Sequence, residues 1–127
     1  MILLDTQIIY AVVQRRLDGL PPEIRNLLLT SDARIAVSVA SLWEIAIKWR
    51  IKKLNLQMEP ELLPALIRSY QFDLLAIDGA HVLAEIVPEL DHQDPFDRLL
   101  LGICAAEGMK LVTVDRALVD HPLAWRS

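Results

Sequence analysis

Short apolar runs alternate along the chain with segments whose apolar residues recur at helical spacing. The runs are typical of buried strands, and the helical spacing is typical of amphipathic helices that pack on a sheet. The predicted strands are residues 2–4, 35–37, 72–77 and 111–114, with 123–125 as a candidate edge strand. The predicted helices are residues 7–16, 22–30, 41–53, 60–70, 78–87, 95–107 and 115–119.

Prolines and a glycine support several of these boundaries. Pro22 and Pro95 fit the first turn of a helix, and Gly108 fits the position that closes one. Strands that alternate with helices predict an α/β fold with a mostly parallel central sheet. The length of 127 residues fits one domain, which we expect to span residues 1–127.

Four acidic residues follow an apolar strand-like run or stand in the first turns of a helix-like segment: Asp5, Glu44, Asp97 and Asp115. In open α/β sheets, ligands bind beyond the carboxyl ends of the strands, and Asp5 and Asp115 directly follow predicted strands. Several carboxylates in one pocket repel one another and lose hydration, so such a pocket is tolerable mainly when a divalent cation fills it.

Each acid also has a purely structural interpretation. Asp5, Asp94 and Asp115 could cap the helices that follow them, and the dipole of its helix favours an anion at Asp97. Glu44 could close a capping box with Ser41 or pair with Lys48, four residues later. Because these positions would all open toward one pocket, a shared metal site is the interpretation that explains them together.

Composition limits the possible functions. The chain is 54% hydrophobic and carries a net charge of −4, with 13 Lys+Arg against 17 Asp+Glu. A protein that binds nucleic acid through nonspecific attraction to phosphate is usually basic, so this acidic chain does not fit that class. The single Cys104 lies in an apolar run and excludes an internal disulfide. The apolar runs are too short to cross a bilayer and no signal peptide is visible, so we expect a cytoplasmic protein.

Other catalytic motifs are weak or missing. His92 is close in sequence to Asp94 and Asp97 and could assist their site, although a loop histidine is the simpler interpretation. His81 and His121 indicate no particular role, and neither a Gly-x-Ser-x-Gly motif nor a glycine-rich phosphate loop occurs.

The segments LLDT, SLWEIAIK, DPFDRLL and LVTVD, in this order and spacing, resemble the PIN-domain ribonucleases and most closely the VapC-type toxins of bacterial toxin–antitoxin pairs. The resemblance covers essentially the whole chain and implies a three-layer sandwich, with Asp5, Glu44, Asp97 and Asp115 as a metal-binding quartet. Thr6 and Thr113 match polar positions that support the quartet. The run from His92 through Asp94 to Arg98 matches the HxDPFDR variant of the subfamily.

The resemblance also implies endonucleolytic cleavage of RNA that depends on Mg²⁺ or Mn²⁺, the cations that all-oxygen ligands favour. Asp5 and Asp97 would be direct ligands, Asp115 would complete the shell or bind a second ion, and Glu44 would bind or activate a water. Three neighbouring cations could hold substrate phosphate, although each could equally be a surface charge: Lys48, Arg98 and Arg116.

Two other interpretations stay open. A PIN-like scaffold without activity would work through protein contacts alone. A receiver or aspartyl-phosphate phosphatase would also place an aspartate after the first strand, but Gln7 occupies the second acidic position of the phosphatase motif.

The predicted helix 41–53 is apolar nearly all the way round and includes Trp43 and Trp49. Residues 8–13 also carry apolar side chains, so both helices could be sandwiched in the core. Alternatively, they form a groove for a cognate antitoxin, a homodimer face, or both. The sequence does not identify the RNA that is cleaved.

Overall fold

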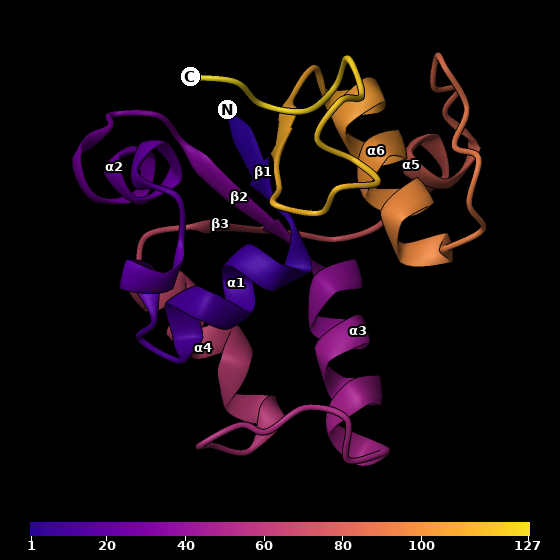
Figure 1. Cartoon of the computed structure of the whole chain (residues 1–127). Helices are drawn as coiled ribbons and strands as arrows, with labels where there is room; N and C mark the ends of the chain where they lie inside the picture. The colour runs from indigo at the N-terminus through magenta and orange to yellow at the C-terminus, as the bar shows by residue number, and fades with distance from the viewer.

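A four-stranded parallel sheet forms the centre of the computed structural model, which describes all residues 1–127 (Figure 1). Its strands are β1 (Ile2–Leu4), β2 (Ile35–Ser38), β3 (Asp73–Leu75) and β4 (Lys110–Val112), in the order β3-β2-β1-β4. Leu3 of β1 pairs with Ala36 on one side and with Leu111 on the other. A parallel bridge between Leu111 and Ala124 adds the end of the chain to this edge. The predicted α/β fold with a parallel sheet is therefore confirmed.

The helices alternate with the strands along the chain, as the periodicity predicts. They are α1 (Thr6–Val13), α2 (Pro22–Thr30), α3 (Val39–Arg50), α4 (Leu63–Ser69), α5 (Gly79–Leu83) and α6 (Pro95–Glu107), with short 3-10 turns at η1 (Leu17–Gly19) and η2 (Pro60–Leu62). No helix has both the length and the hydrophobicity needed to cross a membrane.

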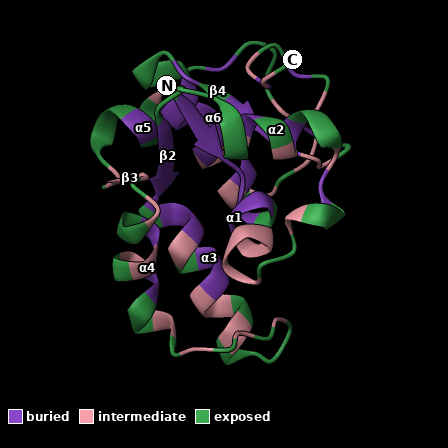
Figure 2. Cartoon of the chain, turned by 90° about the vertical axis from the view of Figure 1, so that its left-hand side faces the viewer, coloured by how far each residue is buried: buried purple, intermediate pink, exposed green.

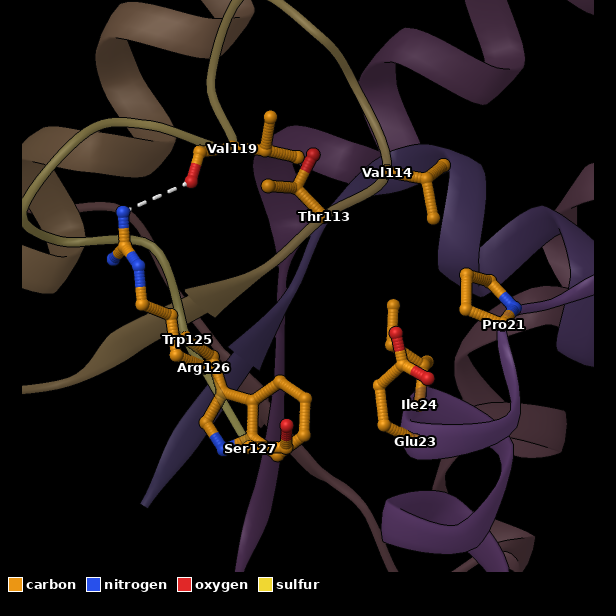
Figure 3. A pocket seen from close by; sticks show the side chains of 9 residues that line it. All are labelled: Pro21, Glu23, Ile24, Thr113, Val114, Val119, Trp125, Arg126 and Ser127. Atoms are coloured by element: carbon orange, nitrogen blue, oxygen red, sulfur yellow. Dashed lines mark hydrogen bonds between the residues drawn. The ribbon is translucent and has the colours of Figure 1, made fainter.

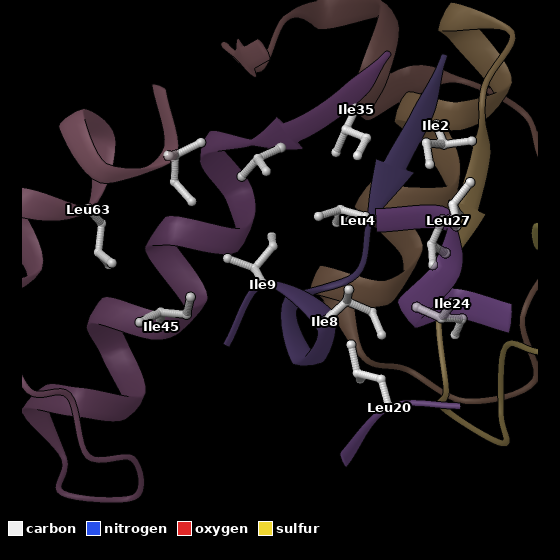
Figure 4. Packing of buried hydrophobic residues seen from close by; sticks show 13 residues of the cluster. Ile2, Leu4, Ile8, Ile9, Leu20, Ile24, Leu27, Ile35, Ile45 and Leu63 are labelled. Carbon is white, nitrogen blue, oxygen red and sulfur yellow. The ribbon is translucent and has the colours of Figure 1, made fainter. Parts of the chain in front are cut away.

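The sheet separates two hydrophobic cores, because successive strand residues face opposite sides. Ile2 and Leu4 belong to one core, which packs against side chains of α1, α2, α3 and α4 (Figure 4). Leu3 belongs to the other, which is built mainly from α6 and includes Cys104. The central strands β1 and β2 are buried while the outer helix faces are exposed (Figure 2). Helices on both faces of the sheet make the expected three-layer arrangement.

Several predicted boundaries are wrong. The predicted helix 78–87 ends at Leu83, because Ala84 is extended and its carbonyl accepts the Arg98 guanidinium instead of a helical N–H. Residues 115–119 form turns rather than a helix. The predicted helix 41–53 begins earlier, at Val39, with Ser38 as its cap.

Candidate metal centre

One pocket at the carboxyl ends of the strands holds all four predicted acidic residues. Its volume is about 370 Å³, and it is lined by Asp5, Thr6, Gln7, Tyr10, Glu44, Lys48, Leu54, Asp94, Asp97 and Asp115. Asp5 directly follows β1, Asp115 follows β4, Glu44 lies on α3 and Asp97 lies in the first turn of α6. Four separate elements thus bring one carboxylate each to the same place.

Asp5 is the most enclosed of these acids, with only 4% of its surface exposed. It caps α1, since its Oδ1 accepts the Thr6 N–H at 2.7 Å, and its Oδ2 accepts the Thr113 hydroxyl at 2.6 Å. Burial raises the pKa of Asp5 to about 6, and the negative charges of Asp97 and Glu44 add to the rise, while the two hydrogen bonds oppose it. The capping interpretation and the pocket position therefore both hold for this residue.

Asp97 is also buried, and it contacts His92. The His92 Nε2 lies 2.9 Å from Asp97 Oδ2, while Asp94 caps α6 by accepting the N–H groups of Phe96 and Asp97. Burial raises the pKa of Asp97, and the hydrogen bond from His92 works against that rise. His92 is thus more than a loop histidine, because it holds one oxygen of a pocket carboxylate.

Glu44 makes the ion pair that its spacing predicts and not the capping box. Its Oε2 lies 2.7 Å from the Nζ of Lys48, and this hydrogen bond raises the pKa of Lys48. The capping box with Ser41 is wrong because Ser38 already caps α3, one turn earlier. The Ser41 hydroxyl instead accepts the Thr6 hydroxyl at 3.0 Å, which ties α3 to α1 beside the pocket.

Asp115 is half-buried and is coupled to Asp5 through Thr113. The Thr113 hydroxyl donates to Asp5 and accepts the backbone N–H of Asp115 at 3.0 Å. The Asp115 Oδ1 accepts the Ala117 N–H at 2.9 Å, so this residue also caps its own turn.

The three candidate cations, Lys48, Arg98 and Arg116, differ in their position relative to the pocket. Only Lys48 lines the pocket. The Arg98 guanidinium is directed elsewhere, since it donates to the Ala84 carbonyl at 2.7 Å and pairs with Glu89 at 2.6 Å. Arg116 is exposed and does not line the pocket. The contacts of Arg98 therefore do not support the hypothesis that it holds substrate phosphate. They instead hold residues 84–89 against α6.

The donor set of the pocket fits a hard divalent cation. Glu44, Asp97 and Asp115 each use one carboxylate oxygen in a hydrogen bond within the protein, which leaves the other oxygen available. Lys48 is the single cationic side chain among five acids that line the pocket. An excess of negative charge, the raised pKa values of Asp5 and Asp97 and ligands that are all oxygen together match what Mg²⁺ or Mn²⁺ requires.

A second group of potential ligands lies on α5 and α6, and the sequence analysis missed it. Ligand atoms of Asp78, His81 and Glu107 lie within 4.8 Å of one another. The His81 Nδ1 accepts the Asp78 N–H, so its Nε2 carries the hydrogen and donates to Glu107 Oε1 at 2.8 Å. Both ring nitrogens are thus satisfied, and the group braces α5 against α6. The capping-box spacing of Asp78 and His81 predicts their mutual contact, while the contact with Glu107 depends on the packing of α5 on α6.

A further pocket of about 380 Å³ lies between α2 and the end of the chain (Figure 3). Glu23 is the one acidic side chain that lines it, and the Arg126 guanidinium in its wall donates to the Val119 carbonyl at 3.2 Å. A single carboxylate gives this pocket no set of metal ligands, so the pocket around Asp5 is the candidate site.

Comparison with known proteins identifies the family of the chain. No curated protein matches the chain. The model of the PIN domain family matches residues 2–122, which is nearly the whole chain, and PIN domains are typically metal-dependent nucleases. The chain belongs to the PIN domain family.

Proposed function

We propose that this protein is a metal-dependent endoribonuclease and the toxin of a toxin–antitoxin pair. The observation that carries the proposal is the convergence of Asp5, Glu44, Asp97 and Asp115 on one pocket beyond the carboxyl ends of the sheet. The resemblance of the four acidic segments to VapC-type toxins supports the toxin role. The RNA substrate and the antitoxin would be met in the cytoplasm.

The four acids would hold Mg²⁺ or Mn²⁺, with Asp5 and Asp97 as the direct ligands. A divalent cation held there supplies an activated water and offsets the charge on the phosphate. Thr6 and Thr113 fix the orientation of the Asp5 carboxylate, and His92 fixes that of Asp97. Such preorganisation lowers the cost of ordering the ligands when the cation binds.

Asp115 and Glu44 have different parts in this account. Asp115 completes the ligand set or binds a second cation, and its backbone is held to Thr113, which also orients Asp5. Glu44 orients a water, and its Oε2 is held by the Nζ of Lys48. The scaffold alternative does not explain why these carboxylates are concentrated in one pocket, where their mutual repulsion and burial cost stability.

Exposed apolar surface supports two protein partners. Trp43 of α3 is 55% exposed and packs edge-on against Phe96, with ring centroids 5.3 Å apart, so α3 is not wholly sandwiched in the core. We assign this face to a homodimer. A largely apolar pocket of about 810 Å³, which includes Val12, Leu29 and Phe72, is the groove that we assign to an antitoxin segment.

The test is a calorimetric titration of the metal-free protein with Mn²⁺ and Mg²⁺. We expect binding to the wild type, and loss of most affinity in Asp97→Asn. The matched control is Asp78→Asn, because Asp78 belongs to the second group of potential ligands. Loss of metal binding in Asp78→Asn, with full retention in Asp97→Asn, would move the metal site away from the proposed pocket.

A further inference from the structure

Basic residues are concentrated at the end of α3. Lys48, Arg50, Lys52 and Lys53 are four of the 13 Lys and Arg residues in a chain of net charge −4, and they fall within six consecutive positions. We call residues 48–53 the basic turn. All four side chains are exposed, and of the four only Lys48 makes an ion pair with the protein. The positive charge of the basic turn is therefore largely free for a ligand.

The backbone of the basic turn folds back toward the acidic pocket. The Lys53 N–H donates to the Lys48 carbonyl at 2.8 Å, and the Lys52 N–H donates to the Trp49 carbonyl at 3.1 Å. This pair of bonds is a Schellman motif, which reverses the chain at the end of a helix. Leu54, directly after it, lines the acidic pocket together with Lys48.

The segment after the turn is fastened to α1. The Asn55 carbonyl accepts the Tyr10 hydroxyl at 2.8 Å and also the side-chain amide of Gln14. Tyr10 itself lines the acidic pocket. The basic turn is thus held at the rim of the pocket, and Lys48 spans the two, with its Nζ on Glu44.

Lys52 stands where a glycine would suit the backbone better. Its φ is 63°, in the left-handed region, and it occupies the position of a Schellman motif that glycine usually fills. The helix dipole favours cations near the last turn of α3, which accounts for Lys48 and Arg50. It does not account for a lysine at a strained position beyond the helix. Arg15 and Gln71 share this left-handed conformation at the ends of α1 and α4, so Lys52 is distinguished by its place among the cations of the basic turn and not by strain alone.

We propose that the basic turn binds the phosphate backbone of RNA and leads the strand into the acidic pocket. Lys48 holds the phosphate nearest the carboxylates, and Arg50, Lys52 and Lys53 hold the flanking ones. Arg50 lies about 9 Å from Glu44 along the axis of α3, so the contacts extend beyond a single nucleotide. The inference rests on the proposed function for the identity of the ligand.

The sharpest variant is Lys52→Gly, because backbone strain and phosphate binding respond in opposite directions. Glycine relieves the strain, so the midpoint of thermal unfolding rises, while the lost cation weakens RNA binding. Arg15→Gly is the matched control. Arg15 has a φ of 57° in an equivalent motif at the end of α1, where its N–H donates to the Val12 carbonyl. Arg15 lines a different pocket from the acidic one. Lys53→Gln is a second test that leaves the backbone alone.

Binding of a fluorescent single-stranded RNA oligonucleotide is measured by anisotropy across a series of KCl concentrations, with Mg²⁺, in an Asp5→Asn background that prevents cleavage. Lys52→Gly and Lys53→Gln each bind about two- to fivefold more weakly. Each also lowers the slope of log K against log salt by about 0.7, the value for one phosphate contact on a single strand. Arg15→Gly leaves both unchanged.

Unchanged affinity and slope in Lys52→Gly and Lys53→Gln would overturn the inference, as would an equal loss in Arg15→Gly. Polyglutamate is the second ligand, and binding as tight as that of RNA would assign the basic turn to an acidic protein instead. If the wild type cleaves RNA but Lys52→Gly and Lys53→Gln leave RNA binding unchanged, this inference alone is wrong. RNA binding that depends on the basic turn, without any cleavage by the wild type, sinks the nuclease proposal alone.

Discussion

Asp5 shows most directly the conflict between burial and charge on which the site depends. The carboxylate is almost fully enclosed: two hydrogen bonds favour its ionised form, while burial and the nearby acids oppose ionisation. Its pKa of about 6 lies above the ordinary value of 3.8, so the folded protein binds this proton more tightly than the unfolded chain does. Stability from Asp5 is therefore present below about pH 4 and is lost as pH rises through about 6.

We predict that Asp5→Asn removes this dependence in metal-free protein. The shift of the Asp5 pKa corresponds to roughly 3 kcal/mol, so the variant is more stable than the wild type at pH 7 by up to that amount. The two converge below pH 4. Urea unfolding with EDTA across pH 3–8 measures the difference. The control Asp32→Asn replaces an exposed carboxyl, so its stability should depend on pH as that of the wild type does.

At this scale the sequence predicts some contacts and cannot predict others. Asp5 and Asp115 were found because each follows a strand, and the Lys48 pair because it lies one helical turn from Glu44. The direction of Arg98 depends on the path of residues 84–89, which is set by packing between α5 and α6. The contact between His92 and Asp97 depends on a loop in the same way.

At the scale of elements, the close packing of α5 on α6 holds the helix that carries Asp97. A Cβ on Gly102 of α6 would overlap the carbonyl oxygen of His81 in α5. The two helices also share the bridge from His81 to Glu107. Glycine is therefore required at this position for close approach and not for its backbone freedom.

We predict that Gly102→Ala destabilises the protein by about 1–3 kcal/mol, because overpacking forces the two helices apart. Gly79→Ala is the control, since nothing lies within 4 Å of the Cβ that it would add. Urea unfolding of both variants gives the comparison. Equal stability of Gly102→Ala and the wild type would mean that α5 can move without cost.

The order of elements was predictable, while their exact ends were not. Periodicity identified each strand and each long helix, because the two sheet faces impose their pattern on the residues. The predicted helix 78–87 failed because apolar spacing continues past Leu83, whereas Ala84 is extended and its carbonyl accepts the Arg98 guanidinium. The start of α3 was missed because Ser38 and Ser41 are both acceptable caps by sequence.

For the whole molecule, an acidic chain with one local basic turn should bind RNA through few phosphates. We predict a shallow dependence of RNA affinity on salt, with a slope of log K against log salt no steeper than about 3, which is four contacts at about 0.7 each. The wild-type limb of the anisotropy experiment measures it. A slope several times steeper would require many phosphate contacts and a wider binding surface.

We also predict that the two apolar surfaces have separate partners. Trp43→Ala weakens self-association about tenfold and leaves metal affinity unchanged, because the exposed indole is removed from a dimer face. Leu29→Ala is the reciprocal variant: it weakens capture of the cognate antitoxin, the expected product of a small gene beside that of the toxin, and leaves self-association intact. Sedimentation velocity and a pull-down separate these effects. A wild type that is monomeric and ignores that product would contradict both assignments.

The most direct test of the central claim is cleavage of RNA by the wild type, Asp5→Asn and Asp97→Asn at increasing Mn²⁺ concentration. We predict that the wild type cleaves in the presence of Mn²⁺ and stops when EDTA is added. Both variants should remain folded, as judged by circular dichroism. Each should cleave RNA about 100-fold more slowly than the wild type, because a metal ligand is lost. Full cleavage by both folded variants, with wild-type dependence on Mn²⁺, would contradict the account.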